Sequence, residues 1–516
     1  MDTARLAEWK HRYGTPPSTE LERLLKAAGR AAAREPAALI DLHETLLFLR
    51  AYPPSVRAAR LADAALAAMA RRVAALRSAG VDLAPFEEPK ISGIAGTGVT
   101  AVFSYEVARR LAARHGSIEI DWEAFDEPDR LGPVLRRIVP PIAEDWPVEA
   151  HTPFRQWMQG GLRWLLERLA QLDLDDRARA DLYESLQLAL DWKVGDGPHT
   201  RSRLRLRGPI YCHTEPLLRR RDIKLDEALE GPPLDIVRLT AREAERILDT
   251  ILDTSAIRYR ELYGFSHPDT RRVFRARDGR GLEIYFFGVP PEWRLPLRAY
   301  HAGMFFKNGV PAGYVEVLSL FDRAEVGFNV YYTFREGESA WIYARLLRLF
   351  RQVLGVNTFS VDPYQIGRQN EEAIDSGAFW FYRKLGFHPV APEAARLLQT
   401  EERHMARQPE WRSSRRTLRK LADGYLVYDG PGAVPGEWDQ FRVRHIGLAM
   451  ARAKAESLAA AFDLIPGLPR WTPAEKAALN AIVEAKQGPD ESRYLRLMQQ
   501  HPRLRAAWLR MGSHEP

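Results

Sequence analysis

The 516-residue chain has a single cysteine and no long apolar run. Because Cys212 is alone, an intramolecular disulfide and any zinc cluster built from cysteines are excluded. Apolar stretches such as 64–75 are interrupted by arginine within a turn or two, so no segment can span a bilayer. Asp2, Glu8 and Lys10 interrupt the N-terminus before a signal peptide could form. We therefore expect a soluble, cytoplasmic protein without a membrane partner.

Several common catalytic motifs are also absent. The histidines have no metal-ligand spacing, and the chain contains no His-Glu-x-x-His, no Gly-Lys-Ser/Thr phosphate loop and no Gly-x-Ser-x-Gly elbow. We therefore expect neither a metal site nor a serine nucleophile. His301 falls on a predicted strand and is interpreted as a packing histidine.

Lysine is scarce, with 11 of the 75 basic residues, and arginine supplies the rest. Codon usage in a GC-rich genome explains this bias as well as phosphate binding does. The net charge of +7 is small for such a length and does not by itself indicate a nucleic-acid partner. Two basic patches, Arg201–Arg221 and Arg412–Lys420, leave tRNA open as an alternative partner, although solvated helix faces explain them more simply.

What the chain does have is the composition of a globular protein, 46% apolar and 28% charged. Its length predicts several domains. We divide it into a helical N-terminal region (1–85), a mixed, mostly helical region with a Gly-rich loop (86–233), a strand-rich region (234–395) and a helical, basic C-terminal region (396–516). The third begins after Gly231-Pro232-Pro233, a sequence typical of linkers.

In the first two regions, apolar spacing predicts mostly helices. They are expected at 37–49, 55–78, 104–113, 153–172 and 176–192, with one strand at 117–122. The Gly-rich loop, 93–101, contains Gly-x-Gly-x-x-Ala, which is typical of dinucleotide sites. The segment before it is a poor strand, so a plain Gly-rich loop is the simpler interpretation.

The third region alternates between strand and helix patterns. Thr240 and Glu243 form a predicted capping box that opens a helix to about 252. Strands are expected at 235–239, 282–288, 299–307, 313–320, 325–332 and 358–363, and a helix at 339–354. A second capping box, Thr472 with Glu475, predicts a late helix in the C-terminal region.

Two motifs of the third region indicate a chemistry. The first, Phe328–Ala340, is a strand that ends in a tight turn at a helix N-terminus. Outward-pointing amides and the helix dipole make such a turn an anion site. The second, Asn370–Phe387, is an asparagine, an aromatic helix face and the ending Tyr-Arg-Lys-Leu-Gly-Phe.

In these motifs and in the order of its elements, the segment 234–395 resembles the GNAT superfamily of acyltransferases. The resemblance implies an α/β (α+β) fold, with a GNAT-like mixed central sheet, helices on both faces, and largely helical flanking regions. It implies acetyl-CoA as cofactor. In the family, the CoA pyrophosphate is held by a loop with the sequence pattern Arg or Gln, any two residues, Gly, any one residue, and then Gly or Ala. Arg335 and Ala340 match that pattern, but Glu338 stands where the family has Gly.

Glu338 brings a bulky side chain and a negative charge to the position where phosphates would approach most closely. Gly337 can supply the permissive backbone if the turn is shifted by one residue. The alternatives are a site that no longer binds CoA and a plain strand-to-helix turn.

The resemblance also assigns roles to individual residues. Tyr382 would protonate the leaving thiolate, since a phenol with a pKa near 10 suits that acceptor. Asn370 would lie near the pantetheine or adenosine, and Val330 would offer its amide to the oxyanion. The phosphate-loop candidates are Arg335, Gly337, Ser339 and Ala340. A packed aromatic face is the alternative for Tyr382.

Amine acylation also needs a base, because the substrate ammonium must lose a proton before it attacks. The family often uses a glutamate on a central strand, and the candidates here are Glu316 and Glu325. Charged residues inside apolar strands are unusual. Each could equally face solvent at a sheet edge.

The expected function is transfer of an acyl group, most simply acetyl from acetyl-CoA, to a small-molecule or peptide amine. One alternative is a GNAT-fold transferase that uses another donor such as aminoacyl-tRNA, motivated by Glu338 and the arginine patches. Another is a catalytically silent binding or scaffold protein. The acceptor and the oligomeric state are left open.

Overall fold

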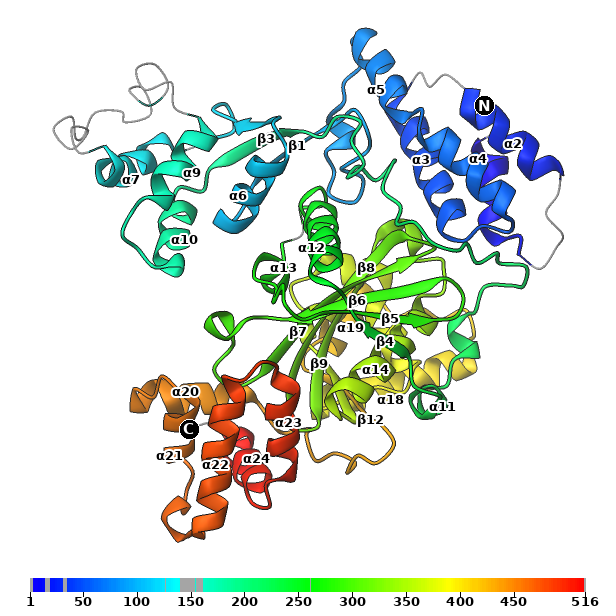
Figure 1. The fold of residues 1–516 in the computed structure, drawn as a ribbon. Helices are drawn as coiled ribbons and strands as arrows, with labels where there is room; N and C mark the ends of the chain where they lie inside the picture. The colour runs from blue at the N-terminus through cyan, green and yellow to red at the C-terminus, as the bar shows by residue number, and fades with distance from the viewer. Residues whose placement is uncertain are drawn as a thin grey trace. The chain divides into compact units, whose positions relative to one another are not determined.

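The computed structural model describes residues 3–13, 19–30, 35–125, 127–139, 154, 161–259 and 261–514 (Figure 1). The chain divides into two compact units. Unit 1 comprises Met1–Pro216, Glu245–His267 and Lys307–Pro311, and unit 2 comprises Leu217–Ala244, Pro268–Phe306 and Ala312–Pro516. Among the described helices, none combines the length and hydropathy that crossing a membrane requires.

Unit 1 begins with a helical bundle. The helices are α1 (Thr3–Glu8), α2 (Thr19–Arg30), α3 (Pro36–Ala51), α4 (Val56–Leu66) and α5 (Met69–Ser78), and both α2 and α3 pack on α4. Pro36 occupies the first turn of α3, and Ser55 caps α4, its hydroxyl accepting from the Ala58 amide at 3.1 Å. The prediction of a single helix over 55–78 is wrong in one respect, because the helix is interrupted at Ala67–Ala68 and forms α4 and α5.

The rest of unit 1 is built on a small antiparallel sheet. Its strands β1 (Gly98–Val102), β2 (Ile118–Ile120) and β3 (Ala189–Lys193) lie in the order β1-β3-β2. Around it are α6 (Tyr105–Arg114), α7 (Leu131–Ile138), α9 (Leu162–Ala170), α10 (Asp176–Glu184) and α13 (Tyr263–Ser266). Leu165, Trp192 and Ile257 are among the buried residues of its core.

Two sequence expectations for this part of unit 1 are corrected. The helix predicted to Trp192 ends at Glu184, because the following residues pair with β1 and β2 as β3. Gly98 begins strand β1 and not a helix, so the dinucleotide-site pattern lacks its required context. Of the helix predicted over 153–172, residues 153 and 155–160 lie outside the described residues.

Unit 2 is organised around a nine-stranded mixed sheet, whose order is β11-β12-β10-β9-β8-β7-β6-β5-β4. Figure 1 shows β5 to β9 side by side. The strands are β4 (Asp235–Arg238), β5 (Val273–Asp278), β6 (Leu282–Gly288), β7 (Ala299–Lys307), β8 (Val310–Leu320), β9 (Arg323–Val330), β10 (Thr358–Val361), β11 (His388–Pro389) and β12 (Leu426–Asp429). The protein is therefore mixed α/β, as predicted, although β5 and β12 were not expected.

The helices before and between the sheet strands include α11 (Leu225–Glu230), α12 (Ala241–Ala256), of which residues 245–256 belong to unit 1, α14 (Ser339–Leu354), α15 (Pro363–Ile366), α16 (Glu371–Ser376), α17 (Ala378–Arg383), α18 (Pro392–Arg407) and α19 (Arg415–Leu421). The C-terminal helices are α20 (Val443–Ala453), α21 (Leu458–Asp463), α22 (Pro473–Lys486), α23 (Glu491–Gln500) and α24 (Leu504–Ser513). Both predicted capping boxes form, at Thr240 with Glu243 and at Thr472 with Glu475.

One pair of strands in the sheet is parallel and short. β9 and β10 pair in parallel only from Arg323 to Glu325, opposite Thr358 to Ser360. β9 then continues to Val330, still paired with β8, while β10 ends at Val361. The two strands therefore part after Glu325, and within the described residues one edge of β9 has no strand partner along Val326–Val330.

Candidate functional site

The two faces of β9 carry different groups. Side chains alternate along a strand, so Glu325, Gly327 and Asn329 share one face and Phe328 lies on the other. Phe328 packs against Tyr343 of α14, with ring centroids 4.9 Å apart, and against Phe381 of α17. The α14 face is therefore aromatic, and the opposite face carries the carboxylates.

Tyr382 belongs to the aromatic face. It is buried among Tyr343, Phe381 and Phe387, with ring centroids 5.2–5.7 Å away. Burial raises the pKa of its phenol, which therefore stays protonated at neutral pH but is a weaker acid than a free phenol. Tyr382 and Glu325 consequently lie on opposite faces of β9. The structure does not place the predicted acid and base side by side.

The two candidate bases lie on the same face, since Glu316 is opposite Gly327 and Leu318 is opposite Glu325 in the β8–β9 register. The Tyr300 hydroxyl donates to the Glu316 carboxylate, while burial raises the pKa of that group. The Arg298 guanidinium lies 3.3 Å from the Glu325 carboxylate.

The N-terminus of α14 is the predicted phosphate site, and the residue at its start is Glu338, whose carboxylate makes no capping hydrogen bond to the helix. Glu338 is fully buried there, and its Oε1 accepts from Arg280 Nε at 2.7 Å and from the Leu218 amide at 3.2 Å. Arg280 comes from the turn between β5 and β6. The departure from the family pattern noticed in the sequence is thus accommodated by a buried ion pair.

The other predicted loop residues also have internal contacts. Arg335 pairs with Glu372 at 2.6 Å, and the Ser339 hydroxyl donates to the Arg335 carbonyl at 3.1 Å. The Gly337 amide donates to the Phe334 carbonyl at 2.9 Å, and Ala340 is buried in α14. These residues form a strand-to-helix turn stabilised from within.

Cationic side chains border this turn on its outer side. Arg219 donates to the Glu336 carbonyl at 3.4 Å, and Arg220 donates to the Lys384 carbonyl at 3.1 Å. Burial, followed by the charges of Arg220 and Arg412, lowers the pKa of Lys384. The cationic groups needed near a phosphate are therefore present beside the α14 N-terminus, outside the position of Glu338.

Asn370 and Val330 have structural positions. The Asn370 side chain caps α16, accepting from the Ala373 amide at 3.1 Å and donating to the Tyr364 carbonyl at 3.0 Å. Val330 ends β9 opposite Gly313, at the far end of the stretch that β10 leaves open. The roles assigned to both residues by resemblance stay predictions.

The sheet face of Glu325 borders a cavity of about 640 Å³ in unit 2. Arg298, Leu318 and Glu325 of the sheet region line it together with Pro363 and Tyr364 after β10. The segment 440–445 before and at the start of α20 closes another side. This cavity could not be predicted from sequence patterns, because its walls come from segments far apart in the chain.

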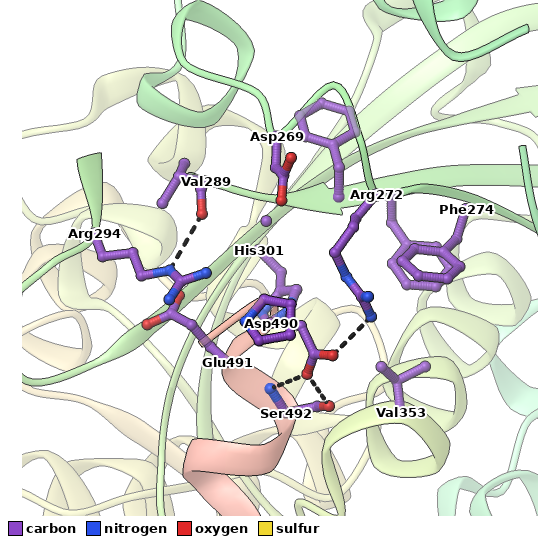
Figure 2. Close-up of a pocket in the computed structure, with 14 residues that line it drawn as sticks. Asp269, Arg272, Phe274, Val289, Arg294, His301, Val353, Asp490, Glu491 and Ser492 are labelled. Atoms are coloured by element: carbon purple, nitrogen blue, oxygen red, sulfur yellow. Dashed lines mark hydrogen bonds and ion pairs between the residues drawn. The ribbon is translucent and has the colours of Figure 1, made fainter. Parts of the chain in front are cut away.

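A second, smaller cavity of about 140 Å³ lies between β6, β7 and the start of α23 (Figure 2). His301 is buried in its wall, and burial lowers the pKa of this imidazole. Among the described residues, His301 Nδ1 has no hydrogen-bond partner. Arg272 donates to Asp490 at 2.7 Å, and Lys486 pairs with Glu491. These paired charges join the C-terminal helices to the sheet.

Unit 1 contains a buried hydrogen-bond chain that the sequence did not reveal. His43 lies between Ser202 and Glu44, with Nε2 3.1 Å from the Ser202 hydroxyl and Nδ1 2.9 Å from the Glu44 carboxylate. The order resembles that of a catalytic triad. However, Ser202 is 1% exposed and its oxygen also accepts from the Ala95 amide, so the chain fastens α3 to two loops.

This imidazole makes stability depend on pH. Burial lowers the pKa of His43 from 6.5 to about 4, against the opposing effect of Glu44. Because the folded state keeps the ring neutral, its contribution is complete above pH 6.5 and is lost as the pH falls towards 4. We expect a loss of about 3 kcal/mol from this group over that range.

Urea unfolding at pH 7.5 and at pH 4.5, with His43→Gln beside the wild type, measures this loss. The variant is expected to lose less stability between the two pH values. An equal loss in both proteins would show that His43 is not the group responsible.

Each of the two basic patches is partly neutralised within the chain. The arginines at 201, 203 and 205 pair with Glu44, Asp196 and Asp63, respectively. In the second patch, Arg415 and Arg419 both pair with Glu371 of α16. These ion pairs lower the positive potential available to a nucleic acid.

Comparison of the chain with known protein families, with characterised proteins and with solved structures finds no match. Function must therefore be argued from the residues and their geometry. Among the described residues, no cluster of histidine, cysteine, aspartate or glutamate is suited to a metal ion.

Proposed function

We propose that this protein is a GNAT-type acyltransferase that moves an acyl group, most simply acetyl from acetyl-CoA, to an amine. The observation that carries the proposal is the parting of β9 from β10 after Glu325. The opening lies between a helix that begins just after β9 and an aromatic helix that follows β10. An extended thioester arm fits such an opening, because the free edge of β9 offers backbone hydrogen bonds to it.

The two faces of the sheet would then have separate tasks. The donor enters from the side of α14 and α17, and its thioester reaches through the opening to the face of Glu325. The acceptor amine binds in the 640 Å³ cavity, where Glu325 accepts its proton. Tyr382 lies on the donor side, where a departing thiolate needs a proton.

The start of α14 lacks the Gly of the family's pyrophosphate pattern, because Glu338 stands there with its carboxylate in a buried ion pair with Arg280. We propose that the pyrophosphate of the donor binds outside this carboxylate, against Arg219, Arg220 and Lys384. Arginine suits phosphate oxygens because its guanidinium donates two parallel hydrogen bonds.

The activity is tested by incubating the purified chain with acetyl-CoA and a panel of primary amines. Release of the free thiol and the acetylated amine by mass spectrometry are the two readouts. We expect thiol release that depends on the amine. Thiol release that is equal with and without every amine would contradict transfer to an amine.

For the predicted acid, Tyr382→Phe keeps the aromatic packing and removes only the hydroxyl. We expect a loss of about 10²-fold in kcat with little change in KM, since the proton is needed at bond cleavage. Phe381→Leu, next to it on α17, is a control for packing. A Tyr382→Phe variant that retains full acetyl transfer would remove this residue from the mechanism.

A further inference from the structure

The cavity beside Glu325 is strongly cationic. Arginines outnumber carboxylates among its lining residues. The arginines are Arg298, Arg323, Arg368, Arg442 and Arg444, and the carboxylates are Glu325 and Asp362. Both carboxylates are already engaged, Glu325 with Arg298 and Asp362 as the cap of α15. The cavity is thus left with an excess of positive charge.

Three of these arginines form no ion pair within 4.0 Å of a carboxylate in the described part of the chain: Arg323, Arg442 and Arg444. Arg323 is buried, and burial lowers its pKa to about 10 against the opposing charge of Glu325, so it keeps its charge at neutral pH. A buried cation that is only partly compensated is costly for the fold, and a bound anion lowers that cost.

The first two of these guanidinium groups are held in place before any ligand arrives. Arg323 donates to the Ser360 hydroxyl at 3.1 Å and to the Phe441 carbonyl at 3.2 Å. Arg442 donates to the Asp439 and Phe441 carbonyls at 2.7 and 2.8 Å. Both lie over the ring of Tyr425, at 5.7 and 5.3 Å. Arginines fixed in this way lose little freedom on binding an oxyanion.

We propose that this cavity binds the acyl acceptor, and that the acceptor is a small amine that also carries a carboxylate or a phosphate. The oxyanion contacts Arg323, Arg442 and Arg444, and the amine lies towards Glu325. This inference rests on the proposed function for the transfer step, but the binding of an oxyanion does not.

In the transfer step the ammonium gives one proton to Glu325, and the neutral nitrogen attacks the carbonyl carbon of the thioester. The new C–N bond forms as the C–S bond breaks. The second proton of the nitrogen ends on the departing sulfur, so that a thiol and an amide are the products. No oxidant or metal is needed.

The acceptor class is tested with three amines that share one aminoethyl group: ethanolamine, β-alanine and O-phosphoethanolamine. We expect the two anionic amines to be acetylated at least tenfold more efficiently than ethanolamine, because each charged hydrogen bond contributes strongly to binding. The anionic amine that is acetylated more efficiently shows whether the cavity prefers a carboxylate or a phosphate. Equal rates for all three amines would overturn the inference while leaving the acyltransferase proposal standing.

Binding is tested separately by calorimetry with inorganic phosphate and with β-alanine, without any acyl donor. Arg444→Gln, at an exposed position, and Arg442→Gln are expected to weaken binding at least tenfold. Arg396→Gln, an exposed arginine of α18 outside the cavity, is expected to bind as the wild type does. Arginine-dependent binding without acetyl transfer would support the cavity and contradict the proposed function. Equal affinity in all four proteins would overturn the cavity.

Discussion

Replacing Glu325 by glutamine is expected to lower kcat/KM for amine acetylation by about 10²-fold or more, the usual contribution of a general base. Glutamine keeps the size of the side chain but cannot take the proton of the ammonium. Steady-state kinetics with an anionic amine as acceptor measures this effect.

Glu316→Gln is the matched control, since Glu316 lies on the same face of the sheet but is bonded to the Tyr300 hydroxyl. A glutamine can still accept from this phenol, so we expect the activity to fall by less than about threefold. A large loss in Glu316→Gln, together with a small one in Glu325→Gln, would assign the base to Glu316 instead. Circular dichroism of both variants checks that the fold is retained.

The second large effect concerns the buried ion pair at the start of α14. Arg280→Met is expected to destabilise the protein by about 3 kcal/mol, because breaking a buried pair leaves one charge without compensation. The affected charge is the carboxylate of Glu338, which is 0% exposed. Guanidinium unfolding measured by fluorescence gives the change in free energy of unfolding.

The double variant Arg280→Met/Glu338→Gln is expected to recover a large part of that loss, since no charge is then left buried. Arg277→Met is the control, because its pair with Glu283 is half-exposed and such pairs contribute little. If Arg277→Met lowers the free energy of unfolding as much as Arg280→Met does, the buried pair of Arg280 and Glu338 contributes no more to stability than a half-exposed one.

Sequence patterns predicted the helices and strands that are determined by the residues of their own segment. The bounds of β6, β7 and α14 agree with those expected, because alternation or helical spacing is complete within each segment. The N-terminal caps at Thr240 and Thr472 were also predicted. The strands β3 and β12 were missed, because they are fixed by pairing with β1 and β10, which lie far away in the chain.

The candidate site could be predicted only in part. The sequence identified Glu338 as the departure from the family pattern, but nothing near it pointed to its partner Arg280 in a distant turn. Glu325 was selected as a strand carboxylate, yet its cavity depends on Arg442 and Arg444, over a hundred residues further on. Contacts that the chain makes only after folding leave no local signal.

The measurement that tests the central claim most directly is calorimetric titration of the wild-type chain with coenzyme A. We expect saturable binding, weakened by raised ionic strength because the phosphates meet arginine and lysine. Arg220→Gln is expected to bind more weakly, and Arg396→Gln equally well. The absence of any binding at millimolar coenzyme A would contradict the claim that this protein is a CoA-dependent acyltransferase.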